Sequence, residues 1–278
     1  MNKKIIYQLK EFGLSIDKLP VRFASSAGPR IFVNSLPKSG TNLITRTLSQ
    51  FPYIYRPLCR TLSEPKLSVD RIITRLENIK TNQFLIGHLW YDDKYQDAMQ
   101  KRSVKQIVVI RDLRDVLISK LFYILNNDRD HILHSKLNTI QSISKQLEML
   151  LIGCKLPNED IRDDLTGLVY EWSKFKKWIN QKSVIIVKFE DLIGESGGGS
   201  KDNQVRVVKT ISQFLDIEMS NKHIDEVCRK IFYSKSKTFR SGKIGGWKEC
   251  FDNDLEGKFK YYLGDELINL GYETDMEW

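Results

Sequence analysis

The chain has 278 residues, of which 41% are hydrophobic and 28% are charged. This balance is typical of a globular protein and excludes collagen-like, disordered and coiled-coil chains. The 44 Lys and Arg residues exceed the 35 Asp and Glu residues by 44 − 35 = 9. A positive surplus of this size favours anionic ligands such as nucleotides, acidic polymers or membrane surfaces, without choosing among them.

The amino-terminal segment is basic and amphipathic. Polar residues interrupt its apolar positions and no small-residue cleavage site follows, so we do not expect a secretory signal. No apolar stretch approaches the roughly 18 residues that a membrane span needs. The four cysteines are scattered, without a CxxC pair. We therefore expect residues 1–28 to form an extension of a cytoplasmic protein with reduced cysteines and no transmembrane segment. Peripheral membrane association and the oligomeric state stay open.

Short apolar runs alternate with helical patterns along the chain. Strands are predicted at 31–35, 84–88, 106–110 and 183–187, and helices at 39–50, 112–125, 139–152, 165–179, 203–215, 220–231 and about 256–270. Apolar strands alternating with helices indicate a parallel sheet buried on both faces. We therefore predict an α/β fold, a single domain over residues 1–278 with a central parallel sheet flanked by helices. Ligands of such sheets bind at the carboxyl ends of the strands.

A phosphate-binding loop is predicted between the first strand and the first helix, in the sequence LPKSGTN of residues 36–42. The turn exposes backbone N–H groups at a helix start, which favours an anion. Gly40 allows close backbone approach, Ser39 and Thr41 add hydroxyl groups, and Lys38 adds a positive charge. The loop is P-loop-like but is not a Walker A motif, because Lys38 precedes Gly40. The alternative is an ordinary helix start with an exposed lysine.

A second anion site is predicted after the third strand. Arg111 follows that strand and can offer two parallel N–H groups to a phosphate. Ser119 lies about two helical turns further on and can add a hydroxyl group. For Arg114 and Asp115 we favour a different role, in a cluster of ion pairs with Asp112 and Arg111 at the start of a helix.

Together these two segments resemble sulfotransferases that use 3′-phosphoadenosine 5′-phosphosulfate (PAPS). The sequence PKSGT resembles the family's 5′-phosphosulfate loop, and Arg111 with Ser119 resembles its 3′-phosphate motif. The segment KFEDL at 188–192 resembles the family's YEDL, which implies that Phe189 lies near the adenine without a tyrosine hydroxyl. A core position for Phe189 is the alternative. The place of Phe232 resembles that of a family aromatic residue that stacks on adenine.

A basic, glycine-containing segment at 234–248 resembles the family's RKGxxGDW segment. It carries five basic residues and no acidic one. The resemblance implies a lid over the nucleotide, in which Arg240, Ser241 and Gly242 bind the 3′-phosphate. Ser241 stands where the family has Lys, and Gly246 where it has Asp. We expect Trp247 to serve packing.

His88, at the end of the second predicted strand, is the candidate general base. An imidazole with a pKa of about 6.5 suits this role near neutral pH. The position resembles the family's catalytic histidine, with Trp90 in place of a proline. Asp92 and Asp93 are the reserve candidates. The other histidines, His131, His134 and His223, are expected at the surface.

The resemblance implies an enzyme that transfers a sulfuryl group from PAPS to a hydroxyl group of an acceptor. The acceptor is a carbohydrate, a lipid or a small alcohol or phenol. Lys38 would stabilise the leaving phosphate oxygen, and no metal or nucleic acid is expected. The alternatives are a kinase-like phosphotransferase and a non-enzymatic basic module that binds acidic polymers. The predicted nucleotide-binding residues are Lys38, Ser39, Gly40, Thr41, Asn42, Arg111, Ser119, Phe189, Phe232, Arg240, Ser241 and Gly242.

Overall fold

The structure is a computed structural model, and it describes residues 27–57, 59–64, 66–154, 165–232 and 243–278. Most of the predicted amino-terminal extension, the first part of the predicted lid and the residues Arg240, Ser241 and Gly242 lie outside these ranges. The chain divides into two compact units, residues 1–110 with 175–236 and residues 111–174 with 237–278. The prediction of one domain over 1–278 stays a prediction.

The first unit is built around a parallel sheet. Its elements are β1 (Arg30–Ser35), α2 (Thr41–Gln50), β2 (Leu62–Ser63), α3 (Val69–Glu77), β3 (Phe84–His88), α4 (Asp93–Gln100), β4 (Val104–Ile110), η4 (Lys176–Trp178), β7 (Val184–Lys188), α9 (Phe189–Leu192), η5 (Glu195–Gly197), α10 (Lys201–Phe214) and α11 (Asn221–Ile231). The strand order is β2-β3-β1-β4-β7, and every neighbouring pair is parallel. The α/β fold with a central parallel sheet is therefore confirmed.

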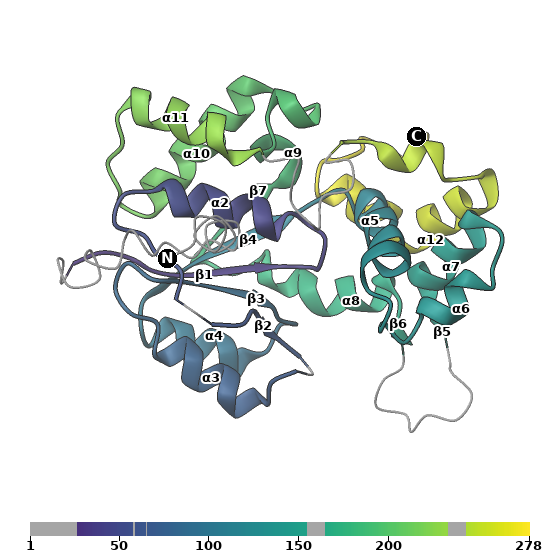
Figure 1. Cartoon of the computed structure of the whole chain (residues 1–278), viewed down its shortest axis with the longest axis horizontal. Coiled ribbons are helices and arrows are strands. Elements are labelled where there is room, and N and C mark those ends of the chain that lie inside the picture. The colour runs from purple at the N-terminus through teal and green to yellow at the C-terminus, as the bar shows by residue number, and fades with distance from the viewer. Residues whose placement is uncertain (1–26, 58, 65, 155–164, 233–242) are drawn as a thin grey trace, which may run out of the picture. The chain divides into compact units, whose positions relative to one another are not determined.

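Helices cover both faces of this sheet (Figure 1). The helices α2, α10 and α11 lie on one face, and α3 and α4 lie on the other. The apolar alternation of the strands supplies the core under the first group, where Ile31, Val33, Ile107 and Val109 are almost fully buried with residues of the three helices. The predicted helix faces, such as that of Leu48 in α2, point into this core.

Side-chain caps explain where several helices begin. A side-chain oxygen accepts a hydrogen bond from a backbone N–H group of the first helical turn at each of these positions, and so satisfies a donor that the helix cannot. The capping residues are Asp92, Asp112, Ser142, Ser200, Ser220 and Asp252. The helix α2 differs, since its cap is Gly40 and no side chain caps it.

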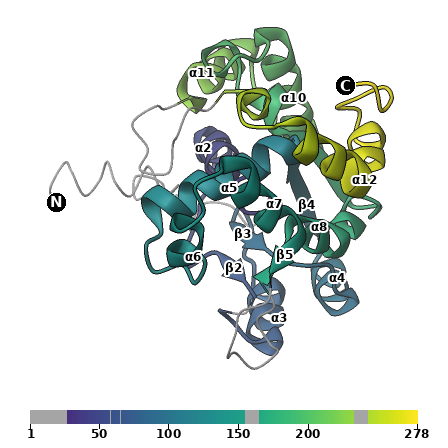
Figure 2. The ribbon, with the colours of Figure 1, turned by 90° about the vertical axis from the view of Figure 1, so that its right-hand side faces the viewer.

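The second unit is mainly helical (Figure 2). It contains α5 (Leu113–Asn127), α6 (His134–Asn138), α7 (Ile143–Ile152), β5 (Gly153–Cys154), β6 (Leu165–Thr166), most of α8 (Leu168–Phe175), η6 (Gly246–Glu249) and α12 (Asn253–Asn269). The strands β5 and β6 form a short antiparallel pair. The helix predicted at 165–179 is therefore wrong at its start, because residues 165–166 pair as a strand and the helix begins at Leu168.

Strand β2 is the one member of the five-stranded sheet that the sequence analysis missed. It has two residues, Leu62 and Ser63, which pair with Gly87 and His88 of β3. Two residues are too few to show alternation, so no periodic pattern indicates them. The strand places residues after Ser63 at the same sheet edge as His88.

Candidate active site

The loop between β1 and α2 has the backbone of an anion site. Lys38 has a φ of 74° and Gly40 a φ of 106°, both in the left-handed region. Ser39 N–H donates to the Leu36 carbonyl at 3.2 Å, which closes a tight turn. The turn leads directly into the first turn of α2, where the Leu43 N–H group donates to the Gly40 carbonyl at 2.9 Å. Backbone N–H groups at a helix start and the positive charge of Lys38 attract an anionic group.

Serine and threonine hydroxyl groups tie this loop to the end of β1. The Ser35 and Thr41 hydroxyl oxygens lie 2.8 Å apart, and Ser35 is fully buried. Ser39 is buried as well, whereas Lys38 is partly exposed and Asn42 is exposed. The loop therefore presents its lysine at the carboxyl edge of the sheet while its hydroxyl groups fix it to the core.

His88 ends β3, the strand next to β1, and its ring faces the same edge. Its Nδ1 lies 2.8 Å from the Ser35 carbonyl oxygen and 3.5 Å from the Ser35 hydroxyl. A carbonyl only accepts, so Nδ1 carries the proton that the shorter bond needs. In the neutral ring Nε2 is then the free acceptor. Burial lowers the pKa of His88, the cations Lys66 and Lys38 lower it further, and the bond to Ser35 opposes them.

The reserve candidates Asp92 and Asp93 are engaged locally. Asp92 caps α4 by accepting from the Lys94 N–H group at 2.8 Å. Asp93 accepts from the Tyr91 hydroxyl at 2.9 Å. These contacts account for both carboxylates as parts of a helix start, and they favour His88 among the three candidates.

Phe189 lies against the loop. It follows β7 as the first residue of α9, and it is 6% exposed. A Cβ atom added to Gly40 would come within 2.8 Å of the Phe189 ring, so the ring and the loop backbone are in close contact. This contact requires glycine at position 40 in addition to the positive φ. Phe232 ends α11 in an extended conformation.

Arg111 and Ser119 belong to the second unit, at and after the start of α5. Arg111 follows Ile110, the last residue of β4, and is 7% exposed. Its Nη2 donates to the Lys243 carbonyl at 3.2 Å and lies 3.7 Å from a carboxylate oxygen of Asp115. Ser119 is partly buried, one helical turn beyond Asp115. Asp115 and Ser119, four positions apart, lie on one face of α5, whereas Arg111 precedes the helix and its cap Asp112.

The predicted ion-pair cluster at this helix start is present. Arg114 binds Asp112 through two nitrogens, at 3.0 and 2.7 Å, and also pairs with Glu273 at 2.6 Å. The Trp247 and Trp278 rings lie 3.9 and 4.3 Å from the guanidinium carbon. Trp247 is 8% exposed, in agreement with the packing role expected for it.

The described end of the basic segment is fastened to this cluster through Asp115. One carboxylate oxygen accepts from the Gly245 N–H group at 2.9 Å and the other from the Trp247 N–H group at 3.1 Å. Burial raises the pKa of Asp115, while Arg111 and these two N–H groups hold it down. Arg111 and the residues 243–247 are therefore linked through one carboxylate.

Other parts of the described chain offer less chemistry. Among residues 27–278, apart from the gaps at 155–164 and 233–242 and the single positions 58 and 65, no cluster of His, Cys, Asp and Glu could hold a metal ion. In the same residues no helix has the length and apolar character to cross a membrane. His131 and His134 are partly exposed as expected. His223 differs, because its Nε2 lies 3.2 Å from the Gln50 carbonyl and joins α11 to α2.

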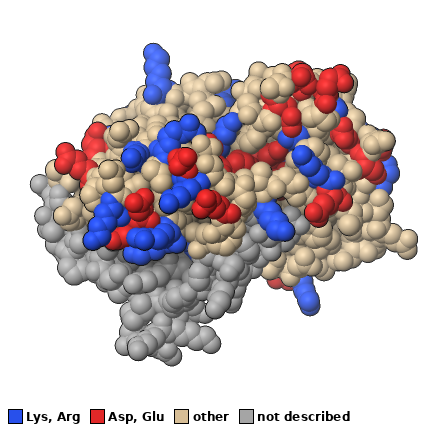
Figure 3. Space-filling view, turned by 90° about the horizontal axis from the view of Figure 1, so that it is seen from above, with Lys and Arg blue, Asp and Glu red and all other residues tan. Residues whose placement is uncertain are grey.

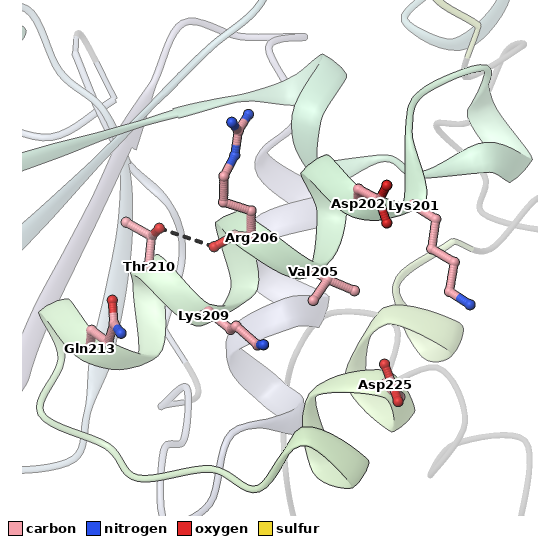
Figure 4. A pocket seen from close by; sticks show the side chains of 8 residues that line it. All are labelled: Lys201, Asp202, Val205, Arg206, Lys209, Thr210, Gln213 and Asp225. Atoms are coloured by element: carbon pink, nitrogen blue, oxygen red, sulfur yellow. Dashed lines mark hydrogen bonds between the residues drawn. The ribbon is translucent and has the colours of Figure 1, made fainter.

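A surface hollow lies on α10 and α11, lined by Lys201, Asp202, Val205, Arg206, Lys209, Thr210, Gln213 and Asp225 (Figure 4). Three cations and two carboxylates line it, and none of the predicted site residues does. On the face that Figure 3 shows, Lys and Arg side chains are interspersed with Asp and Glu. This mixture on that face does not favour the alternative of a module that binds acidic polymers.

The family model described as "Sulfotransferase domain" matches residues 28–271, which is most of the chain. The chain belongs to the sulfotransferase domain family. The predicted resemblance is confirmed, and membership makes the protein a PAPS-dependent sulfotransferase. No curated protein matches the chain.

Solved structures of other proteins share the fold. The mouse sulfotransferase SULT7A1, complexed with PAP, is 19% identical with a TM-score of 0.63, over 93% of this chain and 92% of the other. Retinol dehydratase in complex with retinol and PAP is 16% identical with a TM-score of 0.52, over 96% and 95% of the two chains. At these identities the likeness concerns the fold alone.

Three long-range contacts, two in the first unit and one in the second, were not predicted. Each of them joins residues more than fifty positions apart. The Ser35 carbonyl bonds to His88, the Asn34 amide bonds to Leu89, and the Asp115 carboxylate bonds to Gly245 and Trp247. No spacing pattern connects such residues before the sheet register is known. Asn34 did carry a signal, since it is an amide that directly follows three apolar residues of β1.

Proposed function

We propose that this sulfotransferase transfers a sulfuryl group from PAPS to a hydroxyl group of a carbohydrate, lipid or small alcohol or phenol, with His88 as the general base. The observation that carries the proposal is the bond between His88 Nδ1 and the Ser35 carbonyl. It leaves Nε2 of the neutral ring as a proton acceptor at the sheet edge that also holds the Lys38 loop. The lowered pKa of His88 keeps its ring neutral near pH 7.

The residues of the loop fit an anionic donor group. The N–H groups of residues 39–42 and the Lys38 ammonium would bind the 5′-phosphosulfate, and the left-handed backbone at Lys38 and Gly40 supports this. PAPS supplies the sulfuryl group and a phosphate leaving group. His88 Nε2 takes the acceptor proton while the acceptor oxygen bonds to sulfur. The bond from sulfur to the bridging phosphate oxygen breaks, that oxygen keeps the electron pair, and Lys38 screens its charge.

The remaining residues would bind the rest of the nucleotide. We assign Arg111, which lies just before α5, and Ser119, which lies within it, to the 3′-phosphate together with Arg240, Ser241 and Gly242, which lie outside the described residues. Phe189, which contacts the loop at Gly40, and Phe232 are assigned to the adenine. The donor is PAPS without a metal in this proposal, because Lys38 and N–H groups carry the developing charge.

Calorimetric titration tests the nucleotide assignment. We expect 3′,5′-adenosine bisphosphate (PAP) to bind at least about tenfold more tightly than 5′-AMP, because a charge-assisted bond to the 3′-phosphate adds about 1.5 to 3 kcal/mol. Arg111→Ala should reduce that difference and leave the affinity for 5′-AMP unchanged. Equal affinities in the wild-type protein, or an intact difference in the variant, would refute the assignment.

A second experiment tests the base. A screen of sugars, phenols and long-chain alcohols with radiolabelled PAPS identifies the acceptor class. With that acceptor, His88→Ala should lower turnover by a factor of about 100 to 10,000 and leave PAP affinity intact. Unchanged turnover would refute His88 as the base and turn attention to Asp92 and Asp93, whose alanine variants are the matched controls.

A further inference from the structure

We propose that Asn34, together with Trp178, is a positioning residue for His88: the two side chains clamp the backbone of Leu89 and thereby hold the imidazole against the Ser35 carbonyl. The inference rests on the proposed function only for the role of His88 as a base. The clamp itself is a feature of the described structure, and it has a readout that does not depend on catalysis.

The clamp lies where the sheet register stops. Pairing between β1 and β3 runs from Ile31 with Phe84 to Asn34 with Gly87, and His88 is the last residue of β3. The chain beyond His88 has no further β1 partner in this register. Pairing with β1 therefore holds the chain only on the amino-terminal side of His88, unless another group fixes the residue that follows it.

The Asn34 side chain supplies that missing restraint. Its Nδ2 donates to the Leu89 carbonyl at 3.0 Å, and its Oδ1 accepts from the Leu89 N–H group at 3.0 Å. These two bonds engage both backbone polar groups of Leu89, as a neighbouring strand would. Asn34 is 1% exposed and Leu89 is fully buried, so water does not compete for the bonds. A buried amide whose donor and acceptor both form hydrogen bonds costs little free energy to bury, and those bonds fix its orientation.

Trp178 adds a second donor to the same carbonyl. Its indole Nε1 donates to the Leu89 oxygen at 2.9 Å, and its ring is fully buried. The ring packs edge-on against Tyr91, with centroids 5.0 Å apart. A carbonyl oxygen has two lone pairs, and here donors from β1 and from η4 occupy both. The backbone on the carboxyl side of His88 is thus fixed from two elements.

The consequence for His88 concerns the proton on its ring. The Nδ1 bond to the Ser35 carbonyl is the contact that selects the tautomer with a free Nε2, and Ser35 adjoins Asn34 in β1. If Leu89 is released, the His88 backbone can move, the bond lengthens, and the tautomer with the proton on Nε2 becomes populated. That tautomer cannot take a proton from an acceptor hydroxyl at Nε2. A displacement of about 1 Å at a reacting group typically costs about 100-fold in rate.

Nitrogen NMR of the imidazole side chains tests the clamp directly and needs no acceptor. The protein has four histidines, and the spectrum of His88→Ala assigns the His88 signals. In the wild-type protein we expect the neutral ring to carry its proton on Nδ1. In Asn34→Ala we expect a mixture of tautomers. Trp178→Phe, which removes the indole N–H group and keeps a buried ring, should shift the mixture in the same direction by less.

Turnover provides the second readout, measured with the acceptor that the screen identifies. Asn34→Ala should lower kcat about 10- to 100-fold, with unchanged KM for PAPS and unchanged PAP affinity by calorimetry. Gln106→Ala is the matched control. It removes another buried amide, from β4, which bonds to Gln96 and Ser183 and not to the His88 region. It should lower the unfolding temperature without changing kcat or the His88 tautomer.

Two results would overturn the inference. One is a wild-type His88 tautomer in both Asn34→Ala and Trp178→Phe. The other is a fall in kcat that the Gln106→Ala control reproduces at equal loss of stability. Should Asn34→Ala fail to fold, the tautomer in Trp178→Phe decides. Failure of the proposed function is distinguishable, because it appears as normal turnover in His88→Ala, whereas the tautomer result is independent of turnover.

Discussion

The carboxylate of Asp115 accepts the backbone N–H group of Gly245 at 2.9 Å, across 130 positions of sequence. Its other oxygen accepts the N–H group of Trp247 at 3.1 Å. One buried side chain of α5 thus fastens the segment that begins at Lys243, and the same carboxylate lies 3.7 Å from Arg111. The sheet-edge arginine and the end of the basic segment share a single anchor.

Replacing Asp115 by Asn should destabilise the protein and loosen this segment. The amide has one acceptor oxygen instead of two, so one of the two backbone N–H groups loses its partner, at a cost of about 1–3 kcal/mol. Urea unfolding measures the loss, and hydrogen exchange at Gly245 and Trp247 should accelerate. Asp115→Ala, which leaves both N–H groups without an acceptor, should lose more. Equal losses of unfolding free energy in the two variants would contradict the conclusion that each Asp115 oxygen holds one N–H group.

We expect the side chain of Lys38 to lower the free energy of unfolding while it supports turnover. Its φ of 74° is unfavourable for a residue with a side chain, by about 1–2 kcal/mol. Lys38→Gly relieves this strain, and after the greater chain entropy of unfolded glycine we expect a net gain of about 0.5–1 kcal/mol. The charge is lost, so turnover should fall by at least about 100-fold.

Lys38→Ala is the matched control for this pair of effects. It also removes the ammonium group but keeps a Cβ atom in the left-handed conformation. We expect the same loss of turnover with no gain in the unfolding free energy, measured by urea titration of both variants. A stabilised Lys38→Ala would show that the charge, and not the backbone, carries the strain.

The sequence predicts best those features that depend on residues close together in the chain. The strand at 84–88 agrees with β3 at both ends, and the turn around Lys38 and Gly40 lies between β1 and α2 as expected, because alternation and turn residues are local signals. The anion site that we propose at the loop follows from the same local pattern.

The residues that hold the site are less accessible to sequence reasoning. Ser35 acts on His88 through its backbone carbonyl, and a main-chain group leaves no mark on residue identity. Trp178 reaches Leu89 only because β7 and β3 belong to one sheet, although 89 positions separate the two residues. Asp115 was assigned to a local ion-pair cluster, and its bonds to Gly245 and Trp247 add a partner that no short-range pattern contains.

Arg114 should be essential for the stability of the second unit. Its side chain is 3% exposed and pairs with Asp112 and Glu273 between two tryptophan rings. Arg114→Ala leaves both carboxylates without their cation, a loss of about 3–5 kcal/mol. Arg114→Lys keeps the charge but loses the planar fork and the stacking, so we expect an intermediate loss. Urea unfolding followed by tryptophan fluorescence measures both, and equal stability of wild type and the lysine variant would contradict the stacking account.

The pH dependence of turnover should report His88. Its pKa lies below the ordinary 6.5, chiefly because the ring is buried, with Lys66 and Lys38 adding repulsion. The neutral ring is the active form, so kcat/KM should be level above about pH 6.5 and fall as the pH decreases through the lowered pKa. A base with an unshifted pKa would already lose half its activity near pH 6.5.

The cation contribution to this profile can be separated from burial. Lys66→Met removes a positive charge beside His88 at an exposed position. The protonated imidazole then meets less repulsion, so the His88 pKa rises and the acid limb of kcat/KM moves to higher pH. Lys66→Arg keeps the charge and should leave the limb in place. A limb that moves to lower pH in Lys66→Met, or that moves equally in both variants, would show that the titrating group is not His88.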